Sequence, residues 1–518
     1  MALKITYATM SADNQELNAA YDKAVGEVKS RLGQIHGVIV NGEERTDREL
    51  FEERSPIDRE IIVGRYAQAL PTDVDDAIFA AKAFADEWEG WGWERRRDLM
   101  LVAAELMENE MFELAALMTY EVGKNRLEAL GDVAETVEFL RYYSRQITEH
   151  NGFVTPLSSL SEAEKNVSVL RPYGVWGVIS PFNFPLALSA GPSIGALLTG
   201  NTVVVKPSNT GALMALEFYR IMRTAGLPAG ALHILTGGDE TGDHLAHHEE
   251  LDGLTFTGSY EVGMYLYRTV NEKRPKPVAC EMGGKNPVIV TKTADLDLAA
   301  EGVVRGAFGL SGQKCSATSR VYVEDPVYEA FVDKLVERTR KLKVGHPTER
   351  DVFMGPVIDE AAVKRFAEAI TEVKEKGGEI LAGGRVLDDG ELARGNYVEP
   401  TVVSVSEDSW IWTKELFVPL VVVTKVGSLD EAIAKSNDTP YGLTAGLFST
   451  DEAEIEKWFN EIEAGVTYVN RAAGATTGAW PDIQSFGGWK GSGTSGAGGG
   501  GPWYLRQFLR EQSRTLIR

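Results

Sequence analysis

The chain has 518 residues, with 53 basic and 76 acidic side chains and a formal net charge of −23. This length exceeds what one hydrophobic core holds, and a hydrophobic content of 43% is ordinary for globular proteins, so we expect two or three domains and exclude wholesale disorder. The negative charge keeps the protein soluble and disfavours nucleic acids and anionic membranes as partners. Two cysteines cannot form a disulfide framework, which indicates a reducing, cytoplasmic environment.

The N-terminal part is predicted to be helical. Apolar side chains recur at the spacing of one helix face at Leu17, Tyr21, Val25, Val28 and Leu32. We expect Thr72 to cap a second helix whose apolar stripe reaches Trp88. Two further helices are predicted over 94–120 and 132–146, and the chain opens without the pattern of a secretory leader.

Residues 172–205 contain no Asp, Glu, Lys or Arg. A segment of that length is long enough to cross a bilayer. However, four prolines and several glycines interrupt it, and proline breaks a helix. We therefore interpret it as a buried strand–loop–helix–strand of a globular core.

Short β-rich runs alternate with helices from residue 175 onward. The expected strands are VWGVIS (175–180), NTVVVK (201–206), LHILT (232–236), GLTFT (253–257) and PVACE (277–281). This alternation predicts an α/β fold with a parallel sheet, which binds ligands at the carboxyl ends of its strands. The turns there are rich in Gly, Ser, Thr and Asn, as a nucleotide-binding rim is, although none carries the G-x-G-x-x-G fingerprint.

A second alternating pattern follows Glu281. Its expected elements are strands at 287–291 and 319–324, helices from Leu296 and over 327–341, a turn into a strand at 376–384, and a strand at 465–470. The glycine-rich stretch 491–501 has the composition of a flexible linker. An apolar and basic tail follows it, so we predict a structured loop instead.

Cys315 and Glu281 are the residues best suited to carry chemistry. Cys315 lies in SGQKCSA beside Lys314, and nearby positive charge favours a nucleophilic thiolate; a structural cysteine is the alternative. Glu281 ends a strand before two glycines, where it faces a cleft as a general base or is a solvated strand end. Cys280 is interpreted as a core residue.

Histidines offer no comparable site. His244, His247 and His248 cluster on one short predicted helix without a metal-ligand pattern, and we interpret them as surface residues. No metal ion is expected.

Six motifs occur in the order found in the aldehyde dehydrogenase superfamily, namely SPFNFP, KPS, FTGS, EMGGK, GQKCSA and KELF. The chain resembles this superfamily from about residue 37 to its end. The resemblance implies a Rossmann-type parallel-sheet nucleotide-binding domain, an α/β catalytic domain and a small oligomerisation hairpin. The implied ranges are 1–150 with 173–280, then 281–463, then 151–172 with 464–518. It also implies a homodimer or dimer-based homo-oligomer in which the hairpin and tail pair between subunits.

The same resemblance implies residue roles. Cys315 would attack the aldehyde carbon, Asn183 and the Cys315 N–H would hold the oxyanion, and Glu281 would activate water to hydrolyse the thioester. The implied cofactor is NAD or NADP. Its implied contacts are Ser180, Pro181, Phe182, Lys206, Ser208, Asn209, Gly238, Gly242, Gly258, Ser259, Val262, Met282, Glu415 and Phe417.

Two positions depart from the superfamily pattern. Asn209 stands where NAD-preferring relatives carry an acidic residue that repels a 2′-phosphate, so NADP is not excluded. Val418 stands where glycine is usual after ELF, which affects the loop that carries Phe417.

The substrate is narrowed by a second resemblance. The segments EVGKN (121–125), KCS (314–316) and TGAWPDIQSFGG (477–488) resemble the branch that oxidises L-glutamate γ-semialdehyde, the open form of 1-pyrroline-5-carboxylate. The substrate contacts implied are Lys314, Ser316, Phe184, Gly478, Ala479, Phe486 and Glu135. Glu135 would meet the substrate ammonium, or it is a solvated helix residue.

Departures near the expected carboxylate anchor keep alternatives open. The loop before residue 479 is about three residues longer than in that branch, and IQSF replaces the usual QPF. A second hypothesis is therefore that the substrate is succinic or 2-oxoglutaric semialdehyde. A catalytically silent structural or binding protein on the same fold is the third.

Overall fold

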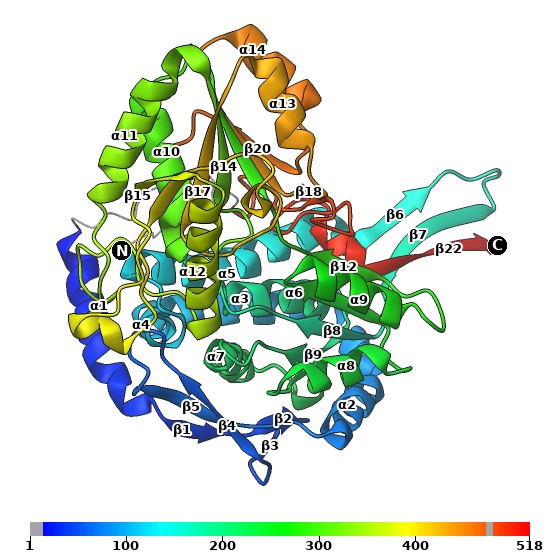
Figure 1. Ribbon diagram of the computed structural model, residues 1–518. Helices are drawn as coiled ribbons and strands as arrows, with labels where there is room; N and C mark the ends of the chain where they lie inside the picture. Colours follow the sequence, from blue (N-terminus) through cyan, green and yellow to red (C-terminus); the bar gives the residue numbers. More distant parts are fainter. Residues whose placement is uncertain (1–13, 473–479) are drawn as a thin grey trace.

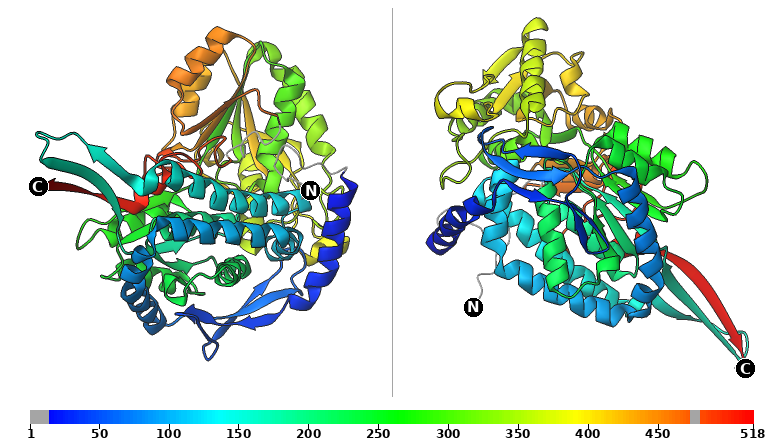
Figure 2. Two further views of the ribbon diagram at one scale, coloured as in Figure 1. Left: turned by 180° about the vertical axis from the view of Figure 1, so that it is seen from behind. Right: turned by 90° about the horizontal axis from the view of Figure 1, so that it is seen from below.

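The computed structural model describes residues 14–472 and 480–518. This part of the chain forms two lobes, each built on a mostly parallel seven-stranded sheet, and an arm of three antiparallel strands that projects from the body (Figures 1 and 2). The α/β architecture expected from the sequence is confirmed, with helices packed on the sheets. No helix among the described residues has the length and apolar character needed to span a membrane.

The first sheet is built from the strands predicted between residues 175 and 281. Its order is β12-β11-β8-β9-β10-β2-β3, and the first five of these strands are mutually parallel. From β8 the chain runs to β9 and β10 on one side and then returns to β11 and β12 on the other. The carboxyl ends of β8 and β11 therefore lie side by side at a topological switch point, where such sheets bind ligands. The strands are β2 (Val38–Val40), β3 (Glu43–Arg45), β8 (Val175–Ile179), β9 (Thr202–Lys206), β10 (Leu232–Ile234), β11 (Gly253–Thr257) and β12 (Val278–Glu281).

The uncharged segment is core, as predicted. It forms β8, helix α6 (Ala187–Leu198) and β9, and almost all of their residues are buried. The crossover helices that complete the lobe are α7 (Ala212–Thr224), α8 (Asp239–His247) and α9 (Tyr260–Val270). Cys280 is buried in β12, as predicted.

Five helices precede β8 and confirm the predicted helical zone, with two corrections. The helix expected over 94–120 is two helices separated at Glu110. Thr72 does not cap its helix, because the helix begins at Pro71 and the Asp73 carboxylate accepts the N–H of Leu70 at 2.9 Å. Proline suits the first helical position, since its missing N–H has no helical partner there. The helices are α1 (Gln15–Val28), α2 (Pro71–Gly90), α3 (Gly92–Asn109), α4 (Met111–Val122) and α5 (Arg126–Glu149).

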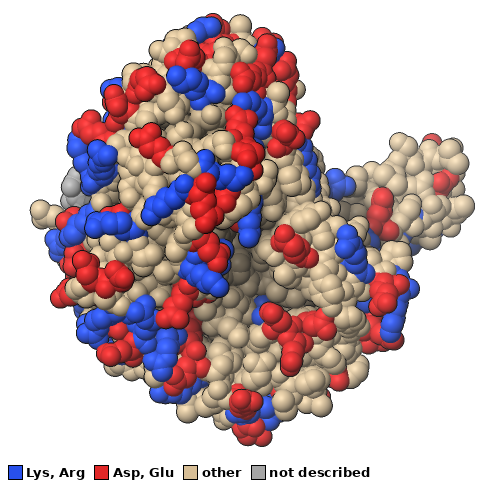
Figure 3. Space-filling view, viewed as in Figure 1, with Lys and Arg blue, Asp and Glu red and all other residues tan. Residues whose placement is uncertain are grey.

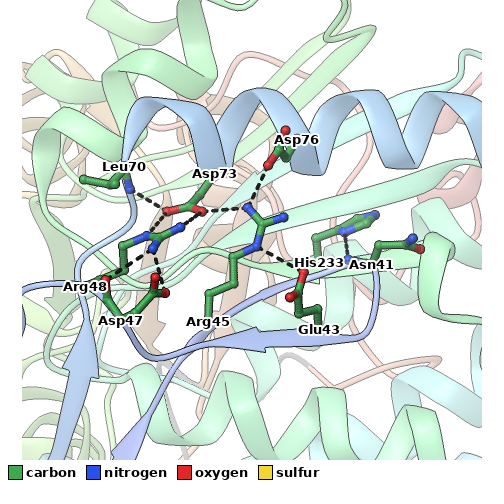
Figure 4. Close-up of polar contacts among 9 residues, drawn as sticks. All are labelled: Asn41, Glu43, Arg45, Asp47, Arg48, Leu70, Asp73, Asp76 and His233. Carbon is green, nitrogen blue, oxygen red and sulfur yellow. Dashed lines mark hydrogen bonds and ion pairs between the residues drawn. The ribbon is translucent and has the colours of Figure 1, made fainter.

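Asp73 also joins α2 to the N-terminal hairpin of β2 and β3 (Figure 4). Its buried carboxylate accepts hydrogen bonds from Arg45 at 2.8 Å and from Arg48 at 2.9 and 3.0 Å. A small sheet of β1 (Gln34–His36), β5 (Ile62–Ala67) and β4 (Leu50–Arg54) flanks this hairpin.

The second sheet has the order β15-β16-β17-β14-β13-β19-β20 and begins soon after the first ends, at Asn286. β20 lies at its edge, although the range 464–518 is predicted with the oligomerisation unit. The strands are β13 (Asn286–Val290), β14 (Thr318–Glu324), β15 (Glu379–Ala382), β16 (Thr401–Ser404), β17 (Leu420–Val426), β19 (Thr444–Phe448) and β20 (Val466–Val469). The helices are α10 (Leu296–Phe308), α11 (Tyr328–Arg340), α12 (Glu360–Glu375), α13 (Leu429–Asn437) and α14 (Glu452–Glu461).

The projecting arm consists of β6 (Val154–Leu157), β7 (Glu164–Pro172) and β22 (Leu509–Ile517). Although the tail is predicted to pair between subunits, β22 here completes the hairpin of its own chain, and the C-terminus lies at the tip (Figure 2). The glycine-rich stretch is ordered, as predicted. It runs beside β12, with hydrogen bonds from Met282 N to Ser492 O at 2.9 Å and from Thr494 N to Cys280 O at 3.1 Å.

Candidate active site

Cys315 lies between the two lobes, in the loop that links the turn Gly309–Gly312 to β14. Its carbonyl accepts a hydrogen bond from the Asn286 side chain at 2.7 Å, which ties the loop to the start of β13. The Cys315 side chain borders a cavity of about 100 Å³. Burial raises the pKa of the thiol well above its usual value, and the carboxylates of Glu415 and Glu281 raise it further. The resting thiol is therefore protonated at neutral pH and needs a proton acceptor to become a nucleophile.

Asn183 approaches this loop from the opposite lobe. It follows β8, is buried, and donates its side-chain amide to the carbonyl of Gln313 at 3.0 Å. An amide nitrogen carries two donors, so this side chain can hold Gln313 and a second acceptor at once. The fold thus brings the Asn183 carboxamide into contact with Gln313, two positions before Cys315 in the chain.

Glu281 borders the same cavity as Cys315. Its Oε2 atom is buried and has no hydrogen-bond partner among the described residues. Burial raises the pKa of this carboxyl to about 8, against a lowering by the backbone N–H of Gly488. A carboxylate with a pKa close to the working pH is suited to general base catalysis.

The residues predicted to bind the cofactor follow the carboxyl ends of the first sheet's strands. Ser259 caps α9 by accepting the N–H of Val262 at 3.4 Å, and a helix start is a favourable site for phosphate oxygens. Lys206 ends β9 and is buried. The rings of Phe182 and Phe417 meet edge to face at 5.9 Å, so the two lobes also touch at this site.

Two observations test whether the groove at the carboxyl ends of these strands fits a dinucleotide. The Oδ1 atom of Asn209 is buried without a partner in the described part of the chain, as expected of a group that awaits a ligand hydroxyl. Gly238 and Gly242 place no side chain beside Asn209 and Lys206, although a Cβ atom on either glycine would lie only 3.9 Å from Asn209 Nδ2 or 3.8 Å from Lys206 Cδ. The residues therefore fit a nucleotide, and the molecular surface is hollowed between the lobes on this face (Figure 3).

The remaining predicted cofactor contacts lie on several segments of the two lobes. Glu415 accepts the N–H of Gly284 at 3.0 Å, and burial raises the pKa of its carboxyl to about 7. Val418 is buried, and its carbonyl packs against Gly312 in the loop that leads to Cys315. A Cβ atom on Gly312 would lie only 2.4 Å from the Val418 carbonyl oxygen. Buried or half-buried positions in these segments are Ser180, Pro181, Ser208, Gly258 and Met282.

The predicted substrate contacts divide into three groups. Glu135, Phe184, Ser316 and Phe486 all line the cavity of Cys315 and Glu281. Lys314 does not line it; its ammonium lies 3.9 Å from the Glu128 carboxylate and borders a separate groove beside Glu415. The predicted residues Gly478 and Ala479 lie outside the described residues.

Glu135 is not a solvated helix residue. It is half-buried, and burial together with Asp132 raises the pKa of its carboxyl to about 8, while Lys124 and Lys314 lower it. Its placement in the cavity supports a role in substrate contact.

Several residues that line the cavity were not predicted from the sequence. Phe139 and Tyr143 follow Glu135 at helical spacings of four and eight, a signal that could have placed them on the same face of α5. The Tyr143 hydroxyl accepts the N–H of Gly500 at 3.0 Å. No local pattern identifies the others, which come from distant segments. They include Leu188, Thr257, Trp480, Gln484 and Tyr504.

The chain is similar to known proteins over nearly its whole length. A family model described as the aldehyde dehydrogenase family matches residues 43–513. The 1-pyrroline-5-carboxylate dehydrogenase of Geobacillus sp. (strain WCH70) is 38% identical over 504 residues, which cover 96% of this chain and 95% of that protein. The 1-pyrroline-5-carboxylate dehydrogenase 1 of Halalkalibacterium halodurans is 37% identical, with the same coverage. A crystal structure of the Thermus 1-pyrroline-5-carboxylate dehydrogenase with bound NAD has a TM-score of 0.93 at 34% identity and covers 98% of both chains.

Proposed function

Because the chain belongs to the aldehyde dehydrogenase family, we propose that it oxidises L-glutamate γ-semialdehyde to L-glutamate. The protein is an NAD(P)-dependent aldehyde dehydrogenase. The assignment of the substrate and of the residue roles is our proposal.

The first half of the proposed reaction forms a covalent adduct on Cys315. Glu281 is the buried carboxylate that shares the cavity with the thiol, and we assign it the proton acceptor role. The Cys315 sulfur then bonds to the aldehyde carbon, and the carbonyl electron pair moves to the oxygen. The side-chain amide of Asn183 and the backbone N–H of Cys315 stabilise this oxyanion in the thiohemiacetal.

The second half releases the acid. NAD or NADP held in the groove would supply the hydride acceptor that converts the thiohemiacetal into a thioester. Glu281 first passes the proton that it took from Cys315 to solvent, and then takes a proton from water, whose oxygen attacks the thioester carbon. The C–S bond breaks, the sulfur takes the proton held by Glu281, and the acid leaves as its carboxylate with release of a proton to solvent.

The groove at the switch point supplies the proposed cofactor contacts. Lys206 and Asn209 would hold the adenosine ribose, and Ser259 with the amides beside Gly258 would face the pyrophosphate. Glu415 would hold the nicotinamide ribose, with Phe417 near the ring. The unpartnered Asn209 Oδ1 supports this assignment.

One observation carries the choice of substrate. Glu135 lies in the same cavity as Cys315 and Glu281, and the aromatic rings of Phe184 and Phe486 line it too. An α-ammonium group would pair with this buried carboxylate, and the aliphatic stem would lie against Phe184 and Phe486. The Ser316 hydroxyl, in the same cavity, would hold the α-carboxylate, and the described lining contains no Lys or Arg.

Steady-state kinetics on three semialdehydes test this proposal. Glutamate γ-semialdehyde should have the highest kcat/KM, ahead of succinic and 2-oxoglutaric semialdehyde. Glu135→Gln should raise KM about tenfold or more for glutamate γ-semialdehyde and leave KM for succinic semialdehyde nearly unchanged, because only the former carries an ammonium. An equal effect on both would remove Glu135 from substrate recognition.

The alternatives make different predictions. A preference for succinic or 2-oxoglutaric semialdehyde would establish the second substrate reading. Inactivity on every aldehyde would favour the silent reading, which the joint placement of Cys315, Glu281 and Asn183 disfavours. Full activity of Cys315→Ala would overturn the mechanism.

We also propose that the arm of β6, β7 and β22 makes a homodimer or dimer-based homo-oligomer. Its sheet projects from the body with open edges, and small exposed sheets seldom persist alone. Exposed apolar side chains on it are Val154, Leu157, Leu516 and Ile517. Light scattering should show a dimer or larger species, and Leu516→Asp with Ile517→Asp should give monomers.

The two free cysteines suit the reducing cytoplasm, where we place the protein.

A further inference from the structure

Three carboxylates on α5 turn toward the reaction centre. Glu128, Asp132 and Glu135 are spaced by four and three residues, which places them on one face of the helix. Asn125 caps this helix by accepting the N–H groups of Leu127 and Glu128, both at 3.0 Å, which sets where the helix begins. Only Glu135 lines the cavity, so the other two act through neighbouring segments.

Asp132 holds the turn that carries Asn183. Its Oδ1 atom accepts the N–H of Ala187, the first residue of α6, at 2.8 Å. Its Oδ2 atom accepts a hydrogen bond from the Lys124 ammonium at 2.7 Å, and both side chains are fully buried. The pair is therefore protected from solvent screening and fixes the start of α6.

Lys124 reaches the same turn at a second point. Its ammonium lies over the ring of Phe184, 3.9 Å from the ring centroid. The ring shields this charge from the cavity, which Phe184 itself lines. The residue next to Asn183 and the first residue of α6 are thus both held by one buried ion pair.

Glu128 holds the loop that carries Cys315. Its Oε1 atom accepts the N–H of Leu310 at 2.5 Å. Leu310 and Ser311 have φ angles of 50° and 54°, in the left-handed region that side chains other than glycine rarely occupy. Such a backbone persists only where its surroundings over-determine it. The Gly355 carbonyl, which accepts the Ser311 hydroxyl at 2.9 Å, supplies a second hold.

We propose that Glu128 and the Lys124–Asp132 pair are positioning residues that set the Asn183 amide relative to the Cys315 sulfur. One rigid helix face holds both loops, so their spacing does not depend on the two lobes alone. This inference rests on the roles proposed above for Asn183 and Cys315.

The main experiment asks whether the ion pair acts through Asn183. The variant Lys124→Met/Asp132→Asn removes both buried charges together and avoids leaving one unpaired. Its kcat for aldehyde oxidation should fall about 10- to 100-fold with an unchanged KM for the cofactor, since a small misplacement of a catalytic group has effects of this size. In an Asn183→Ala background the same two substitutions should change kcat less than about twofold. An equal loss in both backgrounds would overturn the proposal.

Alkylation of Cys315 by iodoacetamide separates the two loops. Displacement at a saturated carbon builds no oxyanion, so the ion-pair variant should be alkylated within about twofold of the native rate. Glu128→Gln should slow both alkylation and oxidation, because it releases the loop of Cys315. If the ion-pair variant and Glu128→Gln lower Tm but leave the rates of oxidation and alkylation unchanged, these residues have structural roles alone and the proposal is overturned.

Glu138→Gln is the matched control on the same helix. Glu138 pairs with Arg141 at 3.5 Å, away from the cavity, so oxidation and alkylation should both stay at native rates. Loss of activity in this control would mean that any change in α5 impairs the enzyme, which would overturn a specific role for the Glu128–Asp132 face. Full activity of Asn183→Ala itself would instead refute the proposed mechanism.

Discussion

The carboxylate of Glu415 accepts a hydrogen bond from the backbone N–H of Gly284 at 3.0 Å. This contact joins the loop that carries Phe417 to the segment between Glu281 and β13, where the chain passes from the first sheet to the second. A residue proposed to hold the nicotinamide ribose is therefore fixed by the connection that also carries the proposed general base.

Gly283→Ala should weaken cofactor binding. A Cβ atom at this position would lie 2.0 Å from Glu415 Oε2, so the carboxylate must move. A loss of about 1.4 kcal/mol of binding corresponds to a tenfold change in affinity, and we expect KM for the cofactor to rise by at least about this factor. Gly26→Ala is the control, because a Cβ on Gly26 in α1 meets nothing within 4 Å. Equal KM values for the two variants would remove Glu415 from the cofactor site.

Activity should rise with pH through the titration of Glu281. The pKa of this carboxyl is about 8, and only its ionised form accepts a proton. Measurements of kcat from pH 6 to 9 should therefore show a limb that increases toward alkaline pH, with a midpoint near that value. In Glu281→Gln we expect kcat to fall by about 10² to 10⁴ and the limb to disappear. A limb that persists in this variant would belong to another group.

NADP should support turnover as well as NAD. Asn209 places no negative charge beside the expected ribose position, so nothing at this residue repels a 2′-phosphate. Asn209→Asp should shift the ratio of kcat/KM values toward NAD by about tenfold or more. Strict use of NAD by the native enzyme, at equal concentrations of the two cofactors, would contradict this expectation.

Asp73→Ala should lower the free energy of unfolding by about 2 kcal/mol at pH 7, because it leaves Arg45, Arg48 and the Leu70 N–H without their shared acceptor (Figure 4). The two arginines and the Leu70 N–H lower the pKa of Asp73 to about 2. A depressed folded-state pKa stabilises the fold above the unfolded value, and this effect is lost as pH falls through about 2.

Asp76→Ala is the matched control for this network. Asp76 is exposed and pairs with Arg45 at 2.8 Å, so the variant should stay within about 0.5 kcal/mol of the native protein. Urea titrations at pH 7 measure both variants. Similar losses for Asp73→Ala and Asp76→Ala would contradict a special role for the buried carboxylate.

Local patterns were sufficient for much of the fold. The five strands of the first sheet follow from alternating β-rich and helical runs, and the interrupted apolar segment 172–205 is buried as expected. The predicted cap at Thr72 is wrong because Pro71 and the side chain of Asp73 set the start of α2. The single helix predicted over 94–120 is wrong because apolar spacing continues on both sides of the break at Glu110 and does not reveal it.

Residue types, spacing and order were sufficient to predict the α/β architecture and the motif order, and they also propose Cys315, Glu281 and Asn183 as a catalytic set. These depend on residue types, spacing and order, which the chain carries directly. The packing of the two lobes was needed to show that Lys314 lies beside Glu128, that Glu135 lines the cavity, and that Asp132 and Glu128 hold the two loops that meet at Cys315. Such contacts join residues from separate segments and depend on how the lobes pack, so no local pattern reveals them.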